Sequence, residues 1–261
     1  MKSPAVLNRI AGRFLAGVQC AEVRVATNNF MQPQITNSQP ALDSLHVLYR
    51  QFADVRNAFE KAHNESKVWP EWREKQVLNF LSVVDTYSHD LEERYVAKRA
   101  DSLATTLRNL VEISIWIQYC GASEEKAKVF LYDCVRDMRE LVEALQKAYQ
   151  SENGSPEPGL QEVIDDIRTM ASREGIPDYD DKYIQVRDAA REIGRASVFN
   201  STYKVCSKLA HPASLMLNVG AEGLLDALFV SGQKLCVLSF NGLLTQIQKS
   251  YPTVTYGEGE T

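Results

Sequence analysis

The sequence lacks the features that mark several classes of protein. It has 5 cysteines in 261 residues, with no Cys-x-x-Cys pair and no dense spacing, so we expect no disulfide framework. Basic residues are not in excess, because 29 Lys and Arg stand against 34 Asp and Glu, for a net charge of −5. The chain therefore lacks the overall positive field of a typical nucleic-acid-binding protein. Reduced cysteines in a mildly acidic chain favour a cytoplasmic location.

Long uninterrupted apolar runs are also missing. The longest apolar stretch, residues 224–247, contains the charged residues Asp226 and Lys234. A helix that spans a membrane needs about 18 or more residues with few or no charges. Near the N-terminus, Arg9 and Arg13 interrupt the apolar residues. We therefore expect neither a membrane-spanning helix nor a secretory signal, and no membrane partner.

Motifs that hold cofactors are not found either. The sequence has no glycine-rich phosphate-binding loop, no nucleophile-elbow motif and no kinase motif. Glu60-x-x-His63 is half of a di-iron motif, but its only counterpart, Asp43-x-x-His46, lies about 25 Å away on the same predicted helix. We interpret Glu60 and His63 as exposed helix surface. The expectation is thus no cofactor and no metal site.

Helical periodicity runs through most of the sequence. Apolar residues recur at positions three and four apart, and the alternation typical of strands is not found. Loop lengths suit antiparallel neighbouring helices. These patterns predict an all-α fold, a multi-helix bundle with an N-terminal helical arm. The main predicted helices cover residues 41–65, 70–99, 103–120, 124–150, 160–173, 181–193, 196–210 and 221–250.

The predicted organisation has three parts. Residues 1–40 form an N-terminal helical arm and a polar connector, residues 41–251 form the all-helical bundle domain, and residues 252–261 form a disordered tail. The arm is amphipathic, with apolar residues on one helical face. These residues are Leu7, Ile10, Phe14, Leu15 and Val18.

Two of the predicted helices carry polar side chains through apolar surroundings. The first has Arg108 and Glu112, and the second has Tyr203, Ser207 and His211. Residues four apart share one face of a helix. Burying such groups costs free energy unless they bond to one another. We therefore expect the two faces to meet, with Arg108 paired to Glu112 and the second helix bonding to that pair or to a ligand.

This set of polar residues has a structural and a chemical interpretation. Buried polar groups often hold the register between helices, whether or not they add stability. In the chemical interpretation, His211 acts as general acid or base, Arg108 binds a phosphate or carboxylate, and Glu112 orients either of them. The catalytic candidates are thus His211, Arg108 and Glu112. The ligand-binding candidates are Tyr203, Lys204 and Ser207.

A resemblance to a known family rests on the same residues. Leu107-Arg108-Asn109-Leu110-Val111-Glu112 is followed about 90 residues later by Tyr203-x-x-x-Ser207-x-x-x-His211-Pro212. This pattern resembles an uncharacterised family of bacterial all-helical proteins, a domain of unknown function, over roughly residues 103–247. More remotely, that family is similar to the HEPN helical bundles. Many HEPN proteins are ribonucleases of toxin–antitoxin and phage-defence systems.

The HEPN resemblance implies RNA as a partner and His211 as the catalytic histidine. The usual HEPN motif has an arginine and a histidine on one helix, separated by four to six residues. Here Lys204, Val205 and Cys206 occupy those positions, so the sequence departs from the motif. Lysine supplies charge but not the planar fork of arginine. Arg108 on the neighbouring helix would have to replace the missing group.

Three functions are left open by the sequence, and whether the protein is an enzyme is open with them. The first is a binding or regulatory module, in stress or phage defence, whose polar cluster is structural or holds a small anionic ligand. The second is a HEPN-like ribonuclease of the toxin type. The third is a homo-oligomeric or protein-interaction module that uses the N-terminal arm and the last helix. Small residues of that helix would let another helix approach closely: Gly232, Ser239 and Gly242.

Overall fold

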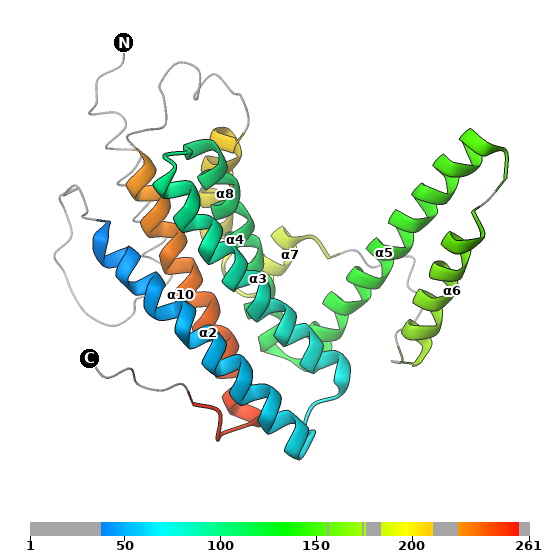
Figure 1. The fold of residues 1–261 in the computed structure, drawn as a ribbon, viewed down its shortest axis with the longest axis horizontal. Helices are drawn as coiled ribbons and strands as arrows, with labels where there is room; N and C mark the ends of the chain where they lie inside the picture. Colours follow the sequence, from blue (N-terminus) through cyan, green and yellow to red (C-terminus); the bar gives the residue numbers. More distant parts are fainter. Residues whose placement is uncertain (1–37, 156, 174, 176–183, 211–223, 256–261) are drawn as a thin grey trace, which may run out of the picture. The chain divides into compact units, whose positions relative to one another are not determined.

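The computed structural model describes residues 38–155, 157–173, 175, 184–210 and 224–255. These residues form eight helices and no strand (Figure 1). The predicted all-α, multi-helix fold is therefore confirmed. The chain divides into two compact units: unit 1 is Met1–Gln118 with Val186–Thr261, and unit 2 is Tyr119–Gln185.

Unit 1 contains most of the helices and the largest apolar core. Its longest helices pack on α10, which lies against both α2 and α3 (Figure 1). Phe52 of α2 and Phe240 of α10 meet edge to face, with ring centres 4.9 Å apart. The helices are α2 (Gln39–Ser66), α3 (Glu71–Val96), α4 (Ala100–Ala122, of which the last residues belong to unit 2), α7 (Val186–Glu192), α8 (Ala196–Ala210) and α10 (Leu225–Ser250).

Helix α10 is the central helix of unit 1. It is long and apolar enough to cross a membrane by length and composition, but 61% of its most apolar stretch is buried within the protein. Gly232 is buried against Leu91 of α3, and a Cβ on Gly242 would lie 3.3 Å from Ile117 of α4. The close approach predicted for α10 is thus made by α3 and α4. The cytoplasmic location stays a prediction.

Unit 2 is a pair of helices, α5 (Glu124–Asn153) and α6 (Pro158–Arg173), that lie side by side (Figure 1). The start of α5 is capped, since the Ser123 side chain accepts a hydrogen bond from the N–H of Lys126 at 3.2 Å. Gly154 ends α5 with φ 74°, a left-handed conformation that favours glycine. Val142 and Ile164 form the buried apolar centre of the pair.

The structure describes part of the predicted C-terminal tail and very little of the predicted N-terminal arm. Of the predicted tail, residues 252–255 are described and form a turn in which Val254 is 1% exposed. The carbonyl of Val254 accepts a hydrogen bond from the Gln248 side chain at 3.0 Å. The predicted arm lies outside the described residues except for 38–40, where α2 begins.

Candidate functional site

The two polar faces predicted to meet do so in unit 1. Nε of Arg108 lies 3.4 Å from Oε1 of Glu112 on the same helix, α4. Nη2 of Arg108 donates a hydrogen bond to the hydroxyl of Tyr203 on α8. The guanidinium carbon also lies 4.4 Å from the centre of the Tyr203 ring. We call these three residues the α4–α8 cluster; its geometry places a cation on an aromatic ring face beside a carboxylate.

The sequence of α8 explains why Tyr203 lies at the edge of the core. Its apolar face buries Phe199, Cys206 and Leu209, and Tyr203 stands next to this face. The rings of Phe199 and Tyr203 are 4.8 Å apart, which fixes the tyrosine against its own helix. Burial raises the pKa of the Cys206 thiol to about 12, and the charge of Arg108 opposes this shift. Cys206 is therefore a protonated core residue beneath Arg108.

The α4–α8 cluster is partly open to solvent. The side chains of Arg108 and Glu112 are 31% and 30% exposed. Within the described residues, Nη1 of Arg108 has no acceptor at hydrogen-bonding distance, whereas Nε and Nη2 have the partners given above. A guanidinium has five N–H groups, so donors remain for a ligand. The orientation of Arg108 is set in advance by Tyr203.

The other predicted site residues are only partly placed. Lys204 is exposed and Ser207 is half-buried on α8, and no hydrogen bond connects either to the α4–α8 cluster in the described part of the chain. His211 follows Ala210, the last residue of α8, and lies outside the described residues. Its catalytic role, like the roles of Arg108 and Glu112, stays a prediction.

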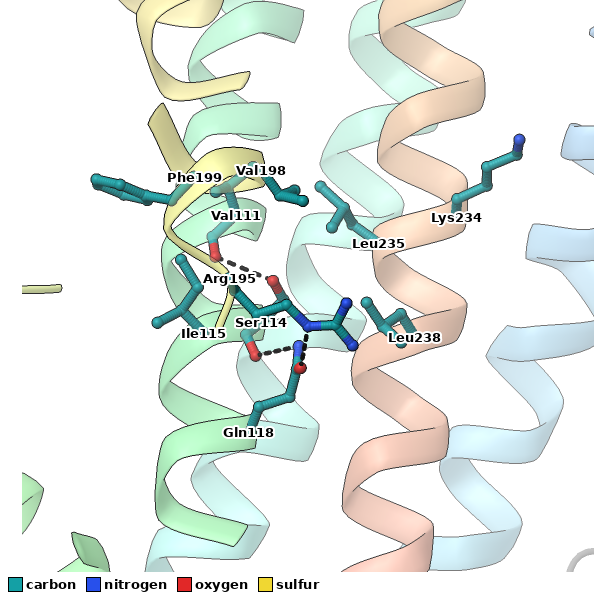
Figure 2. Close-up of a pocket in the computed structure, with 10 residues that line it drawn as sticks. All are labelled: Val111, Ser114, Ile115, Gln118, Arg195, Val198, Phe199, Lys234, Leu235 and Leu238. Carbon is teal, nitrogen blue, oxygen red and sulfur yellow. Dashed lines mark hydrogen bonds between the residues drawn. The ribbon is translucent and has the colours of Figure 1, made fainter. Parts of the chain in front are cut away.

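A small cavity lies between α4, α8 and α10 (Figure 2). At its polar end, Nε of Arg195 donates to Oε1 of Gln118 at 3.1 Å, and the Gln118 amide donates to the carbonyl of Ser114 at 3.1 Å. Figure 2 shows the Arg195 guanidinium reaching across toward Leu238 of α10, while Lys234 points away from the cavity. Its volume of about 30 Å³ is far below the roughly 300–1,000 Å³ of ordinary ligand pockets, so it is too small for an ordinary ligand.

The sequence did not predict Arg195 or Gln118 as neighbours. They are 77 residues apart, and Gln118 does not share the spacing of the polar residues on α4. The only local signal is Gly194, whose φ of 71° turns the chain from α7 into α8 and so places Arg195 at the start of that helix. This turn lets Arg195, a residue between helices, reach the C-terminal part of α4.

A second polar cluster in unit 1 was not predicted. His63 is 6% exposed; its Nε2 lies 3.0 Å from Oε2 of Glu74, and its Nδ1 lies 2.8 Å from the hydroxyl of Tyr251. The backbone N–H of Trp69 donates to the same hydroxyl at 2.9 Å. We call His63, Trp69, Glu74 and Tyr251 the His63 cluster. The interpretation of His63 as exposed surface was wrong, because Tyr251 and Trp69 cover this end of α2.

Within the His63 cluster, both ring nitrogens of His63 and the Tyr251 hydroxyl have hydrogen-bonding partners. The Tyr251 hydroxyl accepts from Trp69, so its proton is available for Nδ1 of His63, and the Nε2 proton then faces Glu74. Glu60, the other residue of the half motif, pairs instead with Arg56 on the exposed side of α2, Nε to Oε1 3.1 Å. Within the described chain, no three His, Cys, Asp or Glu residues are arranged to hold a metal ion. The His63 cluster joins the end of α10 to α2 and α3.

Comparison with known proteins gives a family and no relative of known function. A family of unknown function, DUF5677, matches residues 91–223, about half of the 261-residue chain. The match includes the α4–α8 cluster and unit 2 but none of the His63 cluster. No curated protein and no solved structure matches the chain. The predicted membership of an uncharacterised family is confirmed, whereas its bacterial origin and its likeness to HEPN proteins stay predictions. The chain belongs to DUF5677, a family of unknown function.

Proposed function

We propose that this protein is a binding module that holds the anionic group of a small ligand against Arg108. The observation that carries the proposal is the arrangement of this one side chain. Its guanidinium is fixed by Tyr203 and Glu112, yet about a third of the side chain is exposed (31%). A cation that is held in place before its ligand arrives loses little conformational freedom on binding.

The donor geometry supports a phosphate or carboxylate as the bound group. Arginine presents its N–H groups in a planar fork that matches two oxygens of either anion. Tyr203 uses one Nη2 proton, and Glu112 lies on the Nε side, so the Nη1 donors are left for the ligand within the described structure. Lys204, exposed and next to Tyr203 in sequence, adds a second positive charge on α8.

Titration calorimetry with inorganic phosphate and with acetate, at constant ionic strength, tests the proposal on the full chain. We expect the wild type to bind at least one of the two anions, and Arg108→Gln to bind it about tenfold or more weakly, since a charged hydrogen-bonding partner is lost. Tyr203→Leu removes the aromatic platform, so a loss of a few-fold is expected from the missing cation–π contact.

Arg56→Gln is the matched control, because Arg56 makes the same Nε to Oε1 contact with a glutamate four residues later but lies over no aromatic ring of the described residues. This variant should bind as the wild type does. If neither anion distinguishes the wild type from Arg108→Gln, the proposal is wrong.

A HEPN-like ribonuclease is the second candidate function. It is favoured by one observation: Arg108 reaches across to α8, the helix whose sequence continues directly to His211. The HEPN motif lacks its arginine on α8 in this chain, so another arginine would have to take its place. Arg108, on α4 and in contact with α8, is a candidate for that role. The test is cleavage of a fluorescent single-stranded RNA by the full chain, with Arg108→Gln and His211→Ala expected to lose cleavage while keeping their helical circular dichroism. Equal cleavage by His211→Ala would reject this candidate.

A further inference from the structure

Helix α5 exposes a second apolar face beside the one that packs on α6. The contact with α6 uses Val135 and Val142 of α5. Three other large apolar residues of α5 are exposed, Met138 by 43%, Leu141 by 61% and Leu145 by 49%. Neighbouring exposed residues of this size are typical of an interaction site.

The exposed face continues along α5 with the spacing of a coiled coil. Its residues are alternately three and four positions apart, which corresponds to positions a and d of a seven-residue repeat. This period keeps one face of a helix turned toward a single partner helix. We call these residues the α5 seam: Leu131, Met138 and Leu145 at a, and Cys134, Leu141 and Ala148 at d. All of them are exposed except Leu131, which is half-buried. The spacing therefore indicates another helix as the partner.

The sizes of the seam residues favour a second copy of α5 that runs in the opposite direction. In an antiparallel pair of helices each a residue faces a d residue of the other helix, whereas in a parallel pair a faces a and d faces d. The three a residues of the α5 seam are all large, and two of its three d residues are small. One antiparallel register therefore combines a large side chain with a smaller or equal one in every layer, which keeps the spacing of the helices even. The facing pairs in this register are Leu131 with Ala148, Met138 with Leu141, and Leu145 with Cys134.

The charged residues of α5 leave this antiparallel contact free of repulsion. Between residues 131 and 148, every charged residue except Asp137 is at position b, c or f, which faces away from a partner helix. Asp137 is exposed at position g, beside the seam. In the antiparallel register it lies opposite Ala144 of the second copy, so no two acidic side chains meet along the seam. Unit 2 can therefore approach a second unit 2 although residues 119–185 contain 15 acidic and 8 basic residues.

We propose that this protein forms a homodimer through an antiparallel pair of α5 helices, joined along the α5 seam. Unit 2 is then the dimerisation element, a different part of the chain from the N-terminal arm and α10. The contact is symmetric, so each facing pair occurs twice. Six seam residues are fewer than the about 20–30 residues a side of a standard interface, so the association is weak and reversible. This assignment does not depend on a ligand at Arg108, because the α5 seam and the α4–α8 cluster share no residue.

Sedimentation equilibrium of the full chain, at about 2–200 µM, tests the dimer. We expect the mass to rise from the 29.4 kDa of one chain toward twice that value as the concentration increases. Leu141→Glu places a charge in the seam at an exposed position, so it should raise the dissociation constant about tenfold or more without changing the helical circular dichroism. Gln150→Glu adds the same charge at the exposed position f and is the matched control. A monomer at every concentration, or equal association of the two variants, would overturn the proposal.

Oxidative crosslinking tests the direction of the two helices. In the antiparallel register the two copies of Cys134 are 11 positions out of register, about 16 Å apart along the axis, so the wild type should form no disulfide between them. Leu145→Cys introduces a thiol opposite Cys134 of the second copy. We expect mild oxidation to join positions 134 and 145 of two chains, as identified by peptide mass spectrometry. Links that join like positions, 134 to 134 or 145 to 145, would show a parallel pair and contradict the proposal.

The native Cys134 provides a readout that needs no added thiol. Its side chain is exposed in the single chain, and Leu145 of the second copy covers it in the dimer. We expect its alkylation by iodoacetamide to slow about threefold or more between the lowest and the highest protein concentration, because only the monomer reacts freely. In Leu141→Glu the rate should not change with concentration. A rate that is independent of concentration in the wild type would contradict the antiparallel contact.

Discussion

The α4–α8 cluster and the His63 cluster use similar side chains in different surroundings. Each joins helices of unit 1 through a cationic or titratable side chain, a glutamate and a tyrosine hydroxyl. Arg108 is 31% exposed, whereas His63 is 8% exposed by the same side-chain measure. Exposure, rather than residue type, therefore separates a group that can meet a ligand from one that can only hold the fold.

The two clusters should lose different amounts of free energy when one hydrogen-bonding partner is removed. In a buried cluster, the groups left behind lose their hydrogen bonds and cannot recover them from water. In a partly open cluster, water replaces the missing partner, so the loss is small. We therefore expect the His63 cluster to stabilise unit 1, and the α4–α8 cluster to exchange one partner for another at little cost.

The largest expected effect is on His63. His63→Ala leaves Glu74 and Tyr251 without their partner in a buried site, so we expect the free energy of unfolding to fall by about 3 kcal/mol. His46→Ala is the matched control, because His46 is on the same helix and pairs with Glu92 of α3 at 2.9 Å, but its side chain is 54% exposed. The control should cost no more than about 1 kcal/mol. Urea unfolding followed by circular dichroism measures both, and similar losses would remove the distinction drawn above.

The two tyrosines provide a finer version of the same test. Tyr251→Phe removes one hydroxyl that contacts His63 and the Trp69 N–H, so we expect a loss of about 1–3 kcal/mol. Tyr203→Phe removes a hydroxyl that accepts from the partly hydrated Arg108, and about 0.5 kcal/mol or less is expected. A larger loss for Tyr203→Phe than for Tyr251→Phe would show that the α4–α8 cluster, too, mainly stabilises the fold.

The smallest expected effect is on the chemical modification of Cys206, which lies next to Arg108 but is buried. Cys206 is fully buried (0% exposed) and its pKa is raised to about 12, so only about one thiol in ten thousand is ionised at pH 8. We expect iodoacetamide at pH 8 to modify the exposed Cys134 in the native protein while Cys206 stays unmodified, as measured by peptide mass spectrometry. Modification of both at the same rate would mean that α8 opens and that Tyr203 does not hold Arg108 in place.

The accuracy of the prediction depended on how far apart in sequence the contacting residues are. Arg108 and Glu112 are one helical turn apart, so their pairing followed from spacing alone, and Tyr203 was found because its own spacing marks a polar edge of α8. His63 and Tyr251 are 188 residues apart, and no pattern in either segment indicates the other. The same holds for Arg195 and Gln118, 77 residues apart.

The helix contacts of α10 likewise could be predicted only in part from the sequence. The small residues Gly232 and Gly242 indicated that some helix would lie close, which the structure confirms. Which helices these are, α3 at Leu91 and α4 at Ile117, did not follow from the residues of α10. Small residues on a helix allow another helix to lie close, but they do not indicate which helix it will be.

Periodicity over one or two helical turns was enough to predict that this protein is all helical, where most of its helices begin and end, and which polar residues share a face. Three properties could be read from the folded chain alone: His63 is buried, Arg108 is partly exposed, and an apolar face of α5 is partly exposed in unit 2. Burial depends on what the rest of the chain brings to a surface, and contacts between distant segments are not encoded in the spacing of either one.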